Sequence, residues 1–279
     1  MGGLRLHPPQ LKEVIMSIIT ISKGSYSYGT EVAEKLAEKL GYECVSREVL
    51  LDASHKFDIP EIKLVKAIED PPSFLERLFL GKEKYIAYVR SAFLKRIEKD
   101  NVVYHGFAGH FFVRDVPDVC KIRIIADMEY RIRKVIEKEG VSAAGAKKMI
   151  EKIDEARRKW GLHLYGIDTW DADLYDMVFK VDNMNAENVV DIIANTIQLS
   201  CFQISPESRK YLDNLSLEYE IKANLVEKFP TTRYVSAKDG KVTVIIETTL
   251  KDKEKVGTEM EGILRNINGV KELDIRFKH

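Results

Sequence analysis

The feature that most constrains this chain is a glycine-punctuated turn between a short apolar run and an amphipathic segment. Residues 17–22 read SIITIS, a β-branched run that suits a buried strand. From Thr30 to Leu40, valine and leucine recur every four residues, which indicates one face of a helix that Gly41 is suited to end. We therefore expect the chain to open as strand, glycine turn and helix.

Strands and helices are predicted to alternate after this opening. Further strands are expected at residues 102–105, 121–126 and 176–181. Helices are expected at 46–57 with Ser46 as N-cap, from Pro60, at 82–99 after a break at Pro71-Pro72, at 127–139, from Ser142 to about residue 160, and at 187–199. Such alternation is typical of a parallel sheet. The sequence therefore predicts an α/β fold with a parallel sheet and helices on both of its faces.

The pattern changes after Ser205-Pro206. A helical pattern at 207–228 is followed by two β-rich runs, 233–237 and 241–250, which Asp239-Gly240 joins as a hairpin turn would. A helix at 252–266 and a strand at 271–277 complete the chain. We therefore expect a small C-terminal α+β module at 203–279, a larger domain at 16–202, and an N-terminal extension at 1–15. Met16 could be the true start, which the sequence leaves open.

Charge and cysteine content narrow the function classes. The 44 basic and 44 acidic residues cancel, so net charge gives no reason to expect nucleic-acid or membrane binding. No apolar run reaches the length of about 18 residues that a membrane helix needs. Cys44, Cys120 and Cys201 are odd in number and lack metal-ligand spacing. We expect free thiols, no protein-bound metal and a cytoplasmic location.

The turn itself has the glycine spacing of a P-loop, G-x-x-x-x-G-K-[ST]. Backbone N–H groups of such a turn, together with the helix N-terminus, form an anion site. We therefore expect nucleotide binding at Lys23, Gly24, Ser25, Tyr26, Ser27, Tyr28, Gly29, Thr30 and Glu31.

Two signature positions of the P-loop differ. Thr30 stands where the lysine belongs, and Glu31 stands where the magnesium-binding hydroxyl belongs. Lys23 could reach the phosphates in place of the missing lysine, and Thr30 could offer its hydroxyl. An ordinary strand–turn–helix connection explains the glycines equally well.

Several segments, in chain order, resemble the cytidylate-kinase-like proteins, which are P-loop nucleoside-monophosphate kinases. The resemblance covers about two thirds of the chain and ends near Leu199. It is carried by SIITISKGSYSYGTEVAEKLAEKLGY at 17–42, SREVL at 46–50, VVYHG at 102–106, KIRIIADMEYR at 121–131 and DEARR at 154–158. The resemblance implies a P-loop kinase-like fold, ATP and Mg²⁺ as cofactors, and phosphoryl transfer to a nucleoside monophosphate, with CMP first.

The same resemblance assigns roles to arginines, whose planar side chains bind phosphate oxygens in pairs. Arg131, Arg157 and Arg158 match catalytic lid positions, and Arg133 and Arg47 match substrate-binding positions. The acceptor pocket departs from the family pattern. Gly106-Phe107-Ala108 replaces Gly-Arg-Cys or Gly-Arg-Asp, and Ser46 replaces the aspartate of Asp-Arg-Glu. We expect the flanking His105 and His110 to make structural hydrogen bonds.

These departures leave a second function class open. The chain is either a kinase or a catalytically degenerate nucleotide-binding regulatory protein that acts through its C-terminal module. A purely structural interaction protein is a third alternative. The module resembles a BON-type unit in GKVTV at 240–244 and NGVKEL at 268–273, which implies an interaction unit that could hold a protein partner or a second copy.

Overall fold

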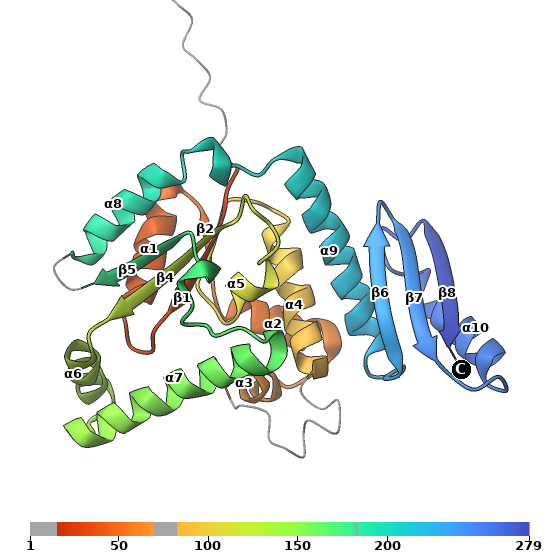
Figure 1. The fold of residues 1–279 in the computed structure, drawn as a ribbon, viewed down its shortest axis with the longest axis horizontal. Helices are drawn as coiled ribbons and strands as arrows, with labels where there is room; N and C mark the ends of the chain where they lie inside the picture. Colours follow the sequence, from red (N-terminus) through yellow and green to blue (C-terminus); the bar gives the residue numbers. More distant parts are fainter. Residues whose placement is uncertain (1–15, 70–82, 182–183, 279) are drawn as a thin grey trace, which may run out of the picture.

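The computed structural model describes residues 16–69, 83–181 and 184–278, which form two separate sheets (Figure 1). The larger sheet has five strands in the order β2-β3-β1-β4-β5, and every neighbouring pair is parallel. Its strands are β1 Ile18–Lys23, β2 Glu43–Val45, β3 Val102–Tyr104, β4 Cys120–Ala126 and β5 Met177–Val181. The predicted parallel sheet is confirmed. The extension at 1–15 and the Pro71-Pro72 break lie outside the described residues.

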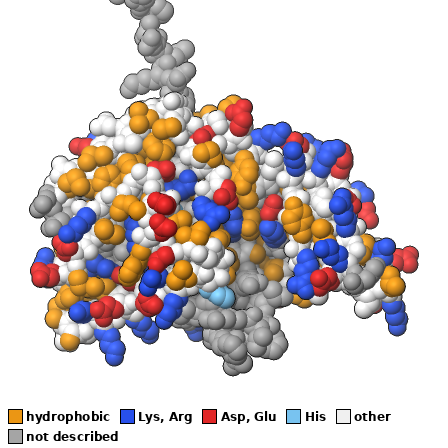
Figure 2. All heavy atoms as spheres, in the orientation of Figure 1, with side chains coloured by type: hydrophobic (Ala, Val, Ile, Leu, Met, Phe, Trp, Pro, Cys, Tyr) orange, Lys and Arg blue, Asp and Glu red, His pale blue; other side chains and the backbone are white. Residues whose placement is uncertain are grey.

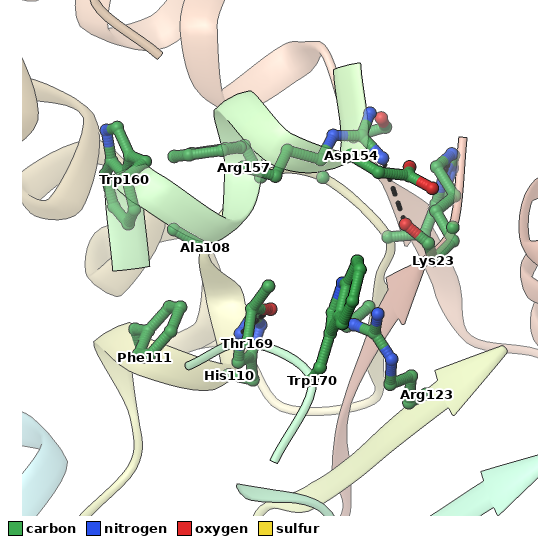
Figure 3. Close-up of a pocket in the computed structure, with 16 residues that line it drawn as sticks. Lys23, Ala108, His110, Phe111, Arg123, Asp154, Arg157, Trp160, Thr169 and Trp170 are labelled. Carbon is green, nitrogen blue, oxygen red and sulfur yellow. Dashed lines mark hydrogen bonds between the residues drawn. The ribbon is translucent and has the colours of Figure 1, made fainter. Parts of the chain in front are cut away.

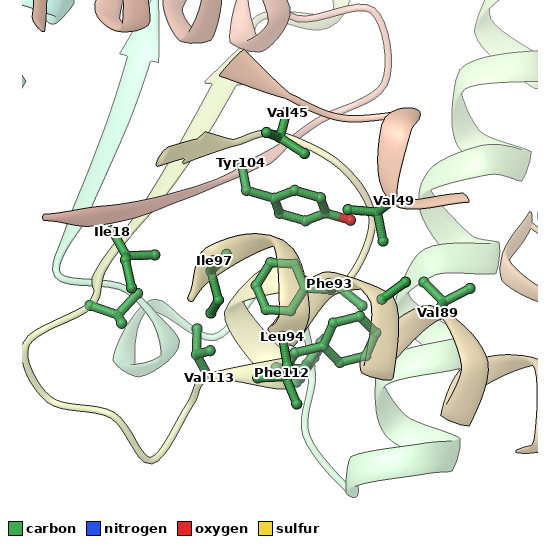
Figure 4. Packing of buried hydrophobic residues seen from close by; sticks show 14 of the residues in the cluster. Ile18, Val45, Val49, Val89, Phe93, Leu94, Ile97, Tyr104, Phe112 and Val113 are labelled. Carbon is green, nitrogen blue, oxygen red and sulfur yellow. The ribbon is translucent and has the colours of Figure 1, made fainter. Parts of the chain in front are cut away.

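Helices cover both faces of this sheet, as predicted. Helices α1 (Gly29–Leu40) and α8 (Ala186–Thr196) pack on one face; α2 (Glu48–Phe57), α4 (Glu83–Ile97) and the short α5 (Gly109–Phe112) pack on the other. Because consecutive strand residues point to opposite faces, Ile18 and Ile19 enter different cores. On the face covered by α2, α4 and α5, Phe93 of α4 lies edge-on to Tyr104 of β3, with 4.7 Å between ring centroids (Figure 4).

Three further α-helices lie in this part of the chain, beside two short 3-10 helices at Ala172–Leu174 and Ser200–Phe202. Helix α3 spans Glu61–Glu69, α6 spans Met128–Glu139, and α7 spans Ala143–Tyr165. Ser142 caps α7 as predicted, since its side chain accepts the N–H of Gly145. The predicted cap at Ser46 is wrong. Arg47 is the N-cap of α2, and Ser46 instead donates its N–H to the Glu48 carboxylate at 2.7 Å.

The C-terminal module also has the predicted order of elements. It contains α9 (Pro206–Leu225), β6 (Thr232–Lys238), β7 (Lys241–Glu247), α10 (Lys253–Leu264) and β8 (Glu272–Lys278). Strands β6 and β7 form an antiparallel hairpin, and β8 pairs parallel to β7. Asp239 and Gly240 both have positive φ, 55° and 84°, as a tight hairpin turn requires.

Helix α9 contacts both cores. Leu212 and Ala223 belong to the core that contains α4, whereas Ile221 and Leu225 belong to the core of the small sheet. A division of the chain near residue 203, just before this helix, stays a prediction.

The surface agrees with the balanced composition. Basic and acidic side chains are interspersed on the face in Figure 2. Among the described residues, no helix combines the length and the apolar character needed to cross a membrane. Cys44, Cys120 and Cys201 are free thiols.

Candidate active site

The glycine turn is fixed to the carboxyl edge of the large sheet. Gly24 donates its N–H to the carbonyl of Ile124 at the end of β4 (3.0 Å), and the Ser27 hydroxyl donates to the same oxygen (3.4 Å). Ligands of open α/β sheets bind at the carboxyl ends of the strands. The turn therefore lies where a ligand is expected, with the N-terminus of α1 directed at it.

Gly29 lets the Lys23 side chain fold back across the start of α1. A Cβ atom on Gly29 would lie 2.5 Å from the Cβ of Lys23, closer than such atoms approach. A Cβ on Gly24 would lie 3.8 Å from the Arg131 guanidinium, which is ordinary contact. Of these two glycines, only Gly29 therefore stands where a side chain would clash with its surroundings.

The Lys23 ammonium lies beside Thr30, the residue that stands at the position of the missing lysine. Its Nζ donates to the Thr30 hydroxyl at 2.5 Å and lies 3.0 Å from Nδ1 of His105. An ammonium can only donate, so His105 accepts at Nδ1 and is neutral with its proton on Nε2. The expected structural role of His105 is thus a hydrogen bond that orients Lys23.

Burial governs the charges of this pair. Burial, then the nearby Arg157, lowers the pKa of Lys23 to about 8. Burial, then the Lys23 charge, lowers the pKa of His105 to about 4. At neutral pH the lysine is therefore predominantly charged and the imidazole is neutral, which matches the direction of their hydrogen bond.

Arg131 holds the turn from within the protein. Its Nε donates to the Ser25 carbonyl at 2.7 Å, and its Nη2 donates to the Ser25 hydroxyl and the Asp154 carboxylate at 2.6 and 2.5 Å. Asp154 also accepts the N–H and the hydroxyl of Ser25 at 3.2 and 2.8 Å. With only 8% of its surface exposed, Arg131 acts here as a clamp on the turn.

Two tyrosines of the turn contact α6. The Tyr26 hydroxyl donates to Glu139 at 3.4 Å, and Tyr26 has a positive φ of 55°. The Tyr28 ring stacks on Tyr130 with centroids 4.3 Å apart. The turn is therefore supported on the α6 side as well.

The structure separates the other predicted arginines. Arg157 donates to the Lys23 carbonyl at 3.0 Å and lies at the turn. Arg158 pairs with Asp168 at 2.7 Å and lies over the Trp170 ring. Arg133 is exposed on α6, because residues two apart on a helix point about 200° apart and Arg131 faces inward. Arg47 makes a two-pronged ion pair with Glu61, at 2.6 and 2.9 Å.

Two cavities meet at the turn and share Lys23, Gly24, Phe107 and Arg157. The smaller one, of about 210 Å³, lies over the carboxyl ends of β1, β3 and β4 and is lined by aromatic rings and cations (Figure 3). The larger one, of about 1190 Å³, is lined by the turn, α2, α3 and α7, and includes Arg47. The turn residues Ser25, Tyr26, Ser27 and Thr30 face this larger cavity.

Arg123 is a site residue that the sequence analysis missed. It lies in β4 and its Nη1 contacts the hydroxyls of Ser22 and Tyr175 at 3.3 and 3.2 Å. It lines the smaller cavity beside His110, whose pKa is lowered to about 3 by burial and then by the Arg123 charge. A single arginine inside the apolar run KIRIIA was the available signal.

The described part of the chain contains no group of three or more His, Cys, Asp or Glu side chains that could hold a metal ion. Glu31, at the position of the usual magnesium-binding hydroxyl, points to solvent and lies 3.5 Å from Lys35. A metal at this site would therefore depend mainly on oxygens of a bound ligand.

Comparison with known proteins shows which family the chain is similar to. A model of the cytidylate kinase-like family matches residues 18–183, more than half of the chain. A cytidylate kinase of Pyrobaculum aerophilum is 26% identical over 191 residues, 68% of this chain and 96% of the relative. A cytidylate kinase of Archaeoglobus fulgidus is 28% identical over 190 residues, which are 67% of this chain and 97% of the relative.

Among solved structures, an uncharacterized protein from Eubacterium ventriosum has a similar fold. The TM-score is 0.53 at 23% identity, and the alignment covers 66% of this chain and 98% of that one. The family match ends before α9, so the C-terminal module lies outside it.

Proposed function

Because the chain belongs to the cytidylate kinase-like family, we propose that it transfers the γ-phosphoryl group of ATP to a nucleoside monophosphate, with CMP as the first candidate. One observation supports turnover above the others. The Lys23 ammonium lies 2.5 Å from the Thr30 hydroxyl, so a positive charge is available where the signature lysine would be. Phosphoryl transfer depends on positioning and on charge stabilisation, and this cation supplies both at the turn.

The two cavities suggest how donor and acceptor would be arranged. The larger cavity is lined by the turn and suits the phosphates of ATP, which Lys23 and the N-terminus of α1 would bind. The smaller cavity offers Arg123, Thr169 and the ring of Trp170, which suit a flat, anionic acceptor. Their shared residues Lys23 and Arg157 would then contact the phosphoryl group between them.

The residues fit ATP phosphates, and they fit Mg²⁺ only as an ion carried by those phosphates. Lys23 and Arg157 are the cations beside the turn, and Ser27 and Thr30 are hydroxyl residues of the turn that line the larger cavity. When bound, Mg²⁺ neutralises charge on the phosphate oxygens. Arg131 and Asp154 would keep the turn in shape, and Arg47 would need to leave Glu61 to contact a substrate.

The non-catalytic alternative has its own support. Phe107 stands where the family has an acceptor-binding arginine, and its ring packs edge-on against Trp160 at 4.3 Å. Under this alternative the protein binds a nucleotide without turnover and acts through its C-terminal unit, which we propose to be a BON-like interaction module.

An ADP-release assay with ATP, Mg²⁺ and each of CMP, dCMP, UMP and AMP separates the alternatives, with titration calorimetry of ATP beside it. Turnover with CMP exceeding that with AMP at least tenfold would support the proposal. Calorimetric ATP binding with no ADP release for any monophosphate would support the regulatory alternative. Absence of ATP binding would contradict both.

A further inference from the structure

The two outer strands of the small sheet differ in how well they are protected. Strand β6 lies beside α9 (Figure 1), and its pairing with β7 is interrupted by an irregularity between Thr232 and Tyr234. Strand β8, at the other edge, is contacted by α10 on its apolar face, and it keeps one unbroken register with β7 from Glu272 to Lys278. Helices and bulges are devices that prevent edge pairing, and a long regular edge strand is a template for another strand.

The charges on β8 follow an order that is complementary to itself. Glu272, Asp274, Arg276 and Lys278 lie on one face of the strand and are all exposed. The two acidic residues come first and the two basic residues follow. If a second β8 lies antiparallel with Ile275 opposite Ile275, then Glu272 faces Lys278 and Asp274 faces Arg276 across the seam.

The backbone of the same strand suits this register. Glu272 donates its N–H to the carbonyl of Gly240, and the Lys278 carbonyl accepts the N–H of Thr248. The backbone N–H and C=O groups of the even-numbered residues therefore point toward β7. Because these directions alternate along a strand, Leu273, Ile275 and Phe277 direct theirs outward. In an antiparallel pair of β8 strands with Ile275 opposite Ile275, the backbone groups of Leu273 would hydrogen-bond with those of Phe277 in the other copy. Those of Ile275 would hydrogen-bond with Ile275 of the other copy.

The opposite face of β8 carries apolar side chains. The side chains of Leu273, Ile275 and Phe277 are only half-buried, and they pack against the core of the module. Two such strands, paired about Ile275, place Leu273 of one copy beside Phe277 of the other. The two module cores then continue into each other.

We propose that the chain forms a two-fold symmetric dimer in which β8 pairs antiparallel with β8 of a second copy. The product is one continuous six-stranded sheet built from the two three-stranded sheets. A two-fold axis requires the antiparallel arrangement, and only that arrangement brings the acidic half of one strand to the basic half of the other. The interface is independent of the proposed kinase activity.

Sedimentation velocity and light scattering on the full chain test the proposal. The wild type is expected to be a dimer at micromolar concentration. In Asp274→Arg, the new arginine of each copy faces Arg276 of the other copy. In Arg276→Asp, the new aspartate of each copy faces Asp274 of the other copy. Each variant alone therefore places like charges opposite each other and should weaken dimerisation at least tenfold. The side chains of Asp274 and Arg276 are 50% and 65% exposed, so both variants should keep the wild-type circular dichroism.

Mixing the two variants provides the sharpest outcome. The mixture restores opposite charges across the seam and should form heterodimers, and the double variant Asp274→Arg/Arg276→Asp should dimerise like the wild type. Arg233→Asp, a charge reversal on the protected strand β6, is the matched control and should leave the dimer intact. A monomeric wild type at 100 micromolar, or dimerisation that Asp274→Arg leaves unchanged, would overturn the proposal.

Discussion

The Nζ atom of Lys23 lies 2.5 Å from the hydroxyl of Thr30, the residue that replaces the signature lysine of a P-loop. The two residues are separated by the whole turn, yet the steric gap at Gly29 lets the lysine cross it. The same ammonium lies 3.0 Å from Nδ1 of His105, which orients it through a second hydrogen bond. The Lys23 ammonium is thus held beside the side chain that stands at the signature lysine's position.

Exchanging the position of the ammonium tests whether Lys23 replaces that lysine. We expect Lys23→Ala to lower kcat by a factor of about 10²–10³, the cost of removing one donor to the transition state. Lys23→Ala/Thr30→Lys should recover at least tenfold of this loss, because the new lysine starts from the signature position. Thr30→Lys alone should give no gain, since two ammonium groups would then repel each other. Steady-state ADP release measures all three, and equal rates for Lys23→Ala and wild type would contradict the assignment.

The lowered pKa of Lys23 also predicts how stability changes with pH. The folded pKa is about 8 and the ordinary value is 10.5, so between these values the unfolded chain binds the extra proton. The free energy of unfolding of the wild type should therefore rise from pH 8 toward 10.5 relative to Lys23→Met, which lacks the group. The change should be about 1–3 kcal/mol, since one pKa unit corresponds to about 1.4 kcal/mol and solvent screens part of it.

Urea unfolding of both proteins at pH 7 and pH 10 measures this difference. Groups common to both proteins cancel in the comparison. A constant gap between the two proteins at both pH values would show that Lys23 is not held in a buried, charged state.

The element pattern was largely readable from the sequence, and the failures have physical reasons. Strand β2 was missed because three residues, Glu43–Val45, are too few to show a period. The hairpin at Asp239-Gly240 was predicted because that dipeptide suits the positive φ of both positions. Local signals of these kinds need no knowledge of distant contacts.

The site was less predictable because its charges depend on long-range pairing. Arg131 and Arg133 look alike in sequence, yet the first is buried against Ser25 and Asp154 and the second is exposed. Arg123 reaches the cavity only because β4 pairs with β1. Such assignments require the register of the sheet and the docking of α7, which no single segment specifies.

Breaking the Arg131–Asp154 pair should cost stability more than it costs chemistry. The two side chains are 10% and 16% exposed, so Arg131→Met leaves a nearly buried carboxylate unpaired and should lower the free energy of unfolding by about 3 kcal/mol. Arg131→Met/Asp154→Asn should be less destabilised than the sum of the two single variants. Arg133→Ala is the matched control on α6 and should stay within about 0.5 kcal/mol of the wild type. Thermal and urea unfolding measure these values, and a stable but inactive Arg131→Met would instead place this arginine on the transferred phosphoryl group.

The paired glycines of the turn should differ in tolerance, because only one of them has no room for a side chain. In Gly29→Ala the new methyl group would lie 2.5 Å from the Cβ of Lys23, so the lysine must move away from Thr30. We expect this variant to lose about 1–3 kcal/mol of unfolding free energy through overpacking and to bind ATP at least tenfold more weakly. In Gly24→Ala the nearest atom would be 3.8 Å away, on Arg131, so stability should change by no more than about 0.5 kcal/mol. Urea unfolding and calorimetric titration of ATP on both variants provide the comparison. If Gly29→Ala keeps wild-type stability and affinity, the Lys23 side chain does not cross the turn at this point, and the proposed source of the phosphate-binding charge is wrong.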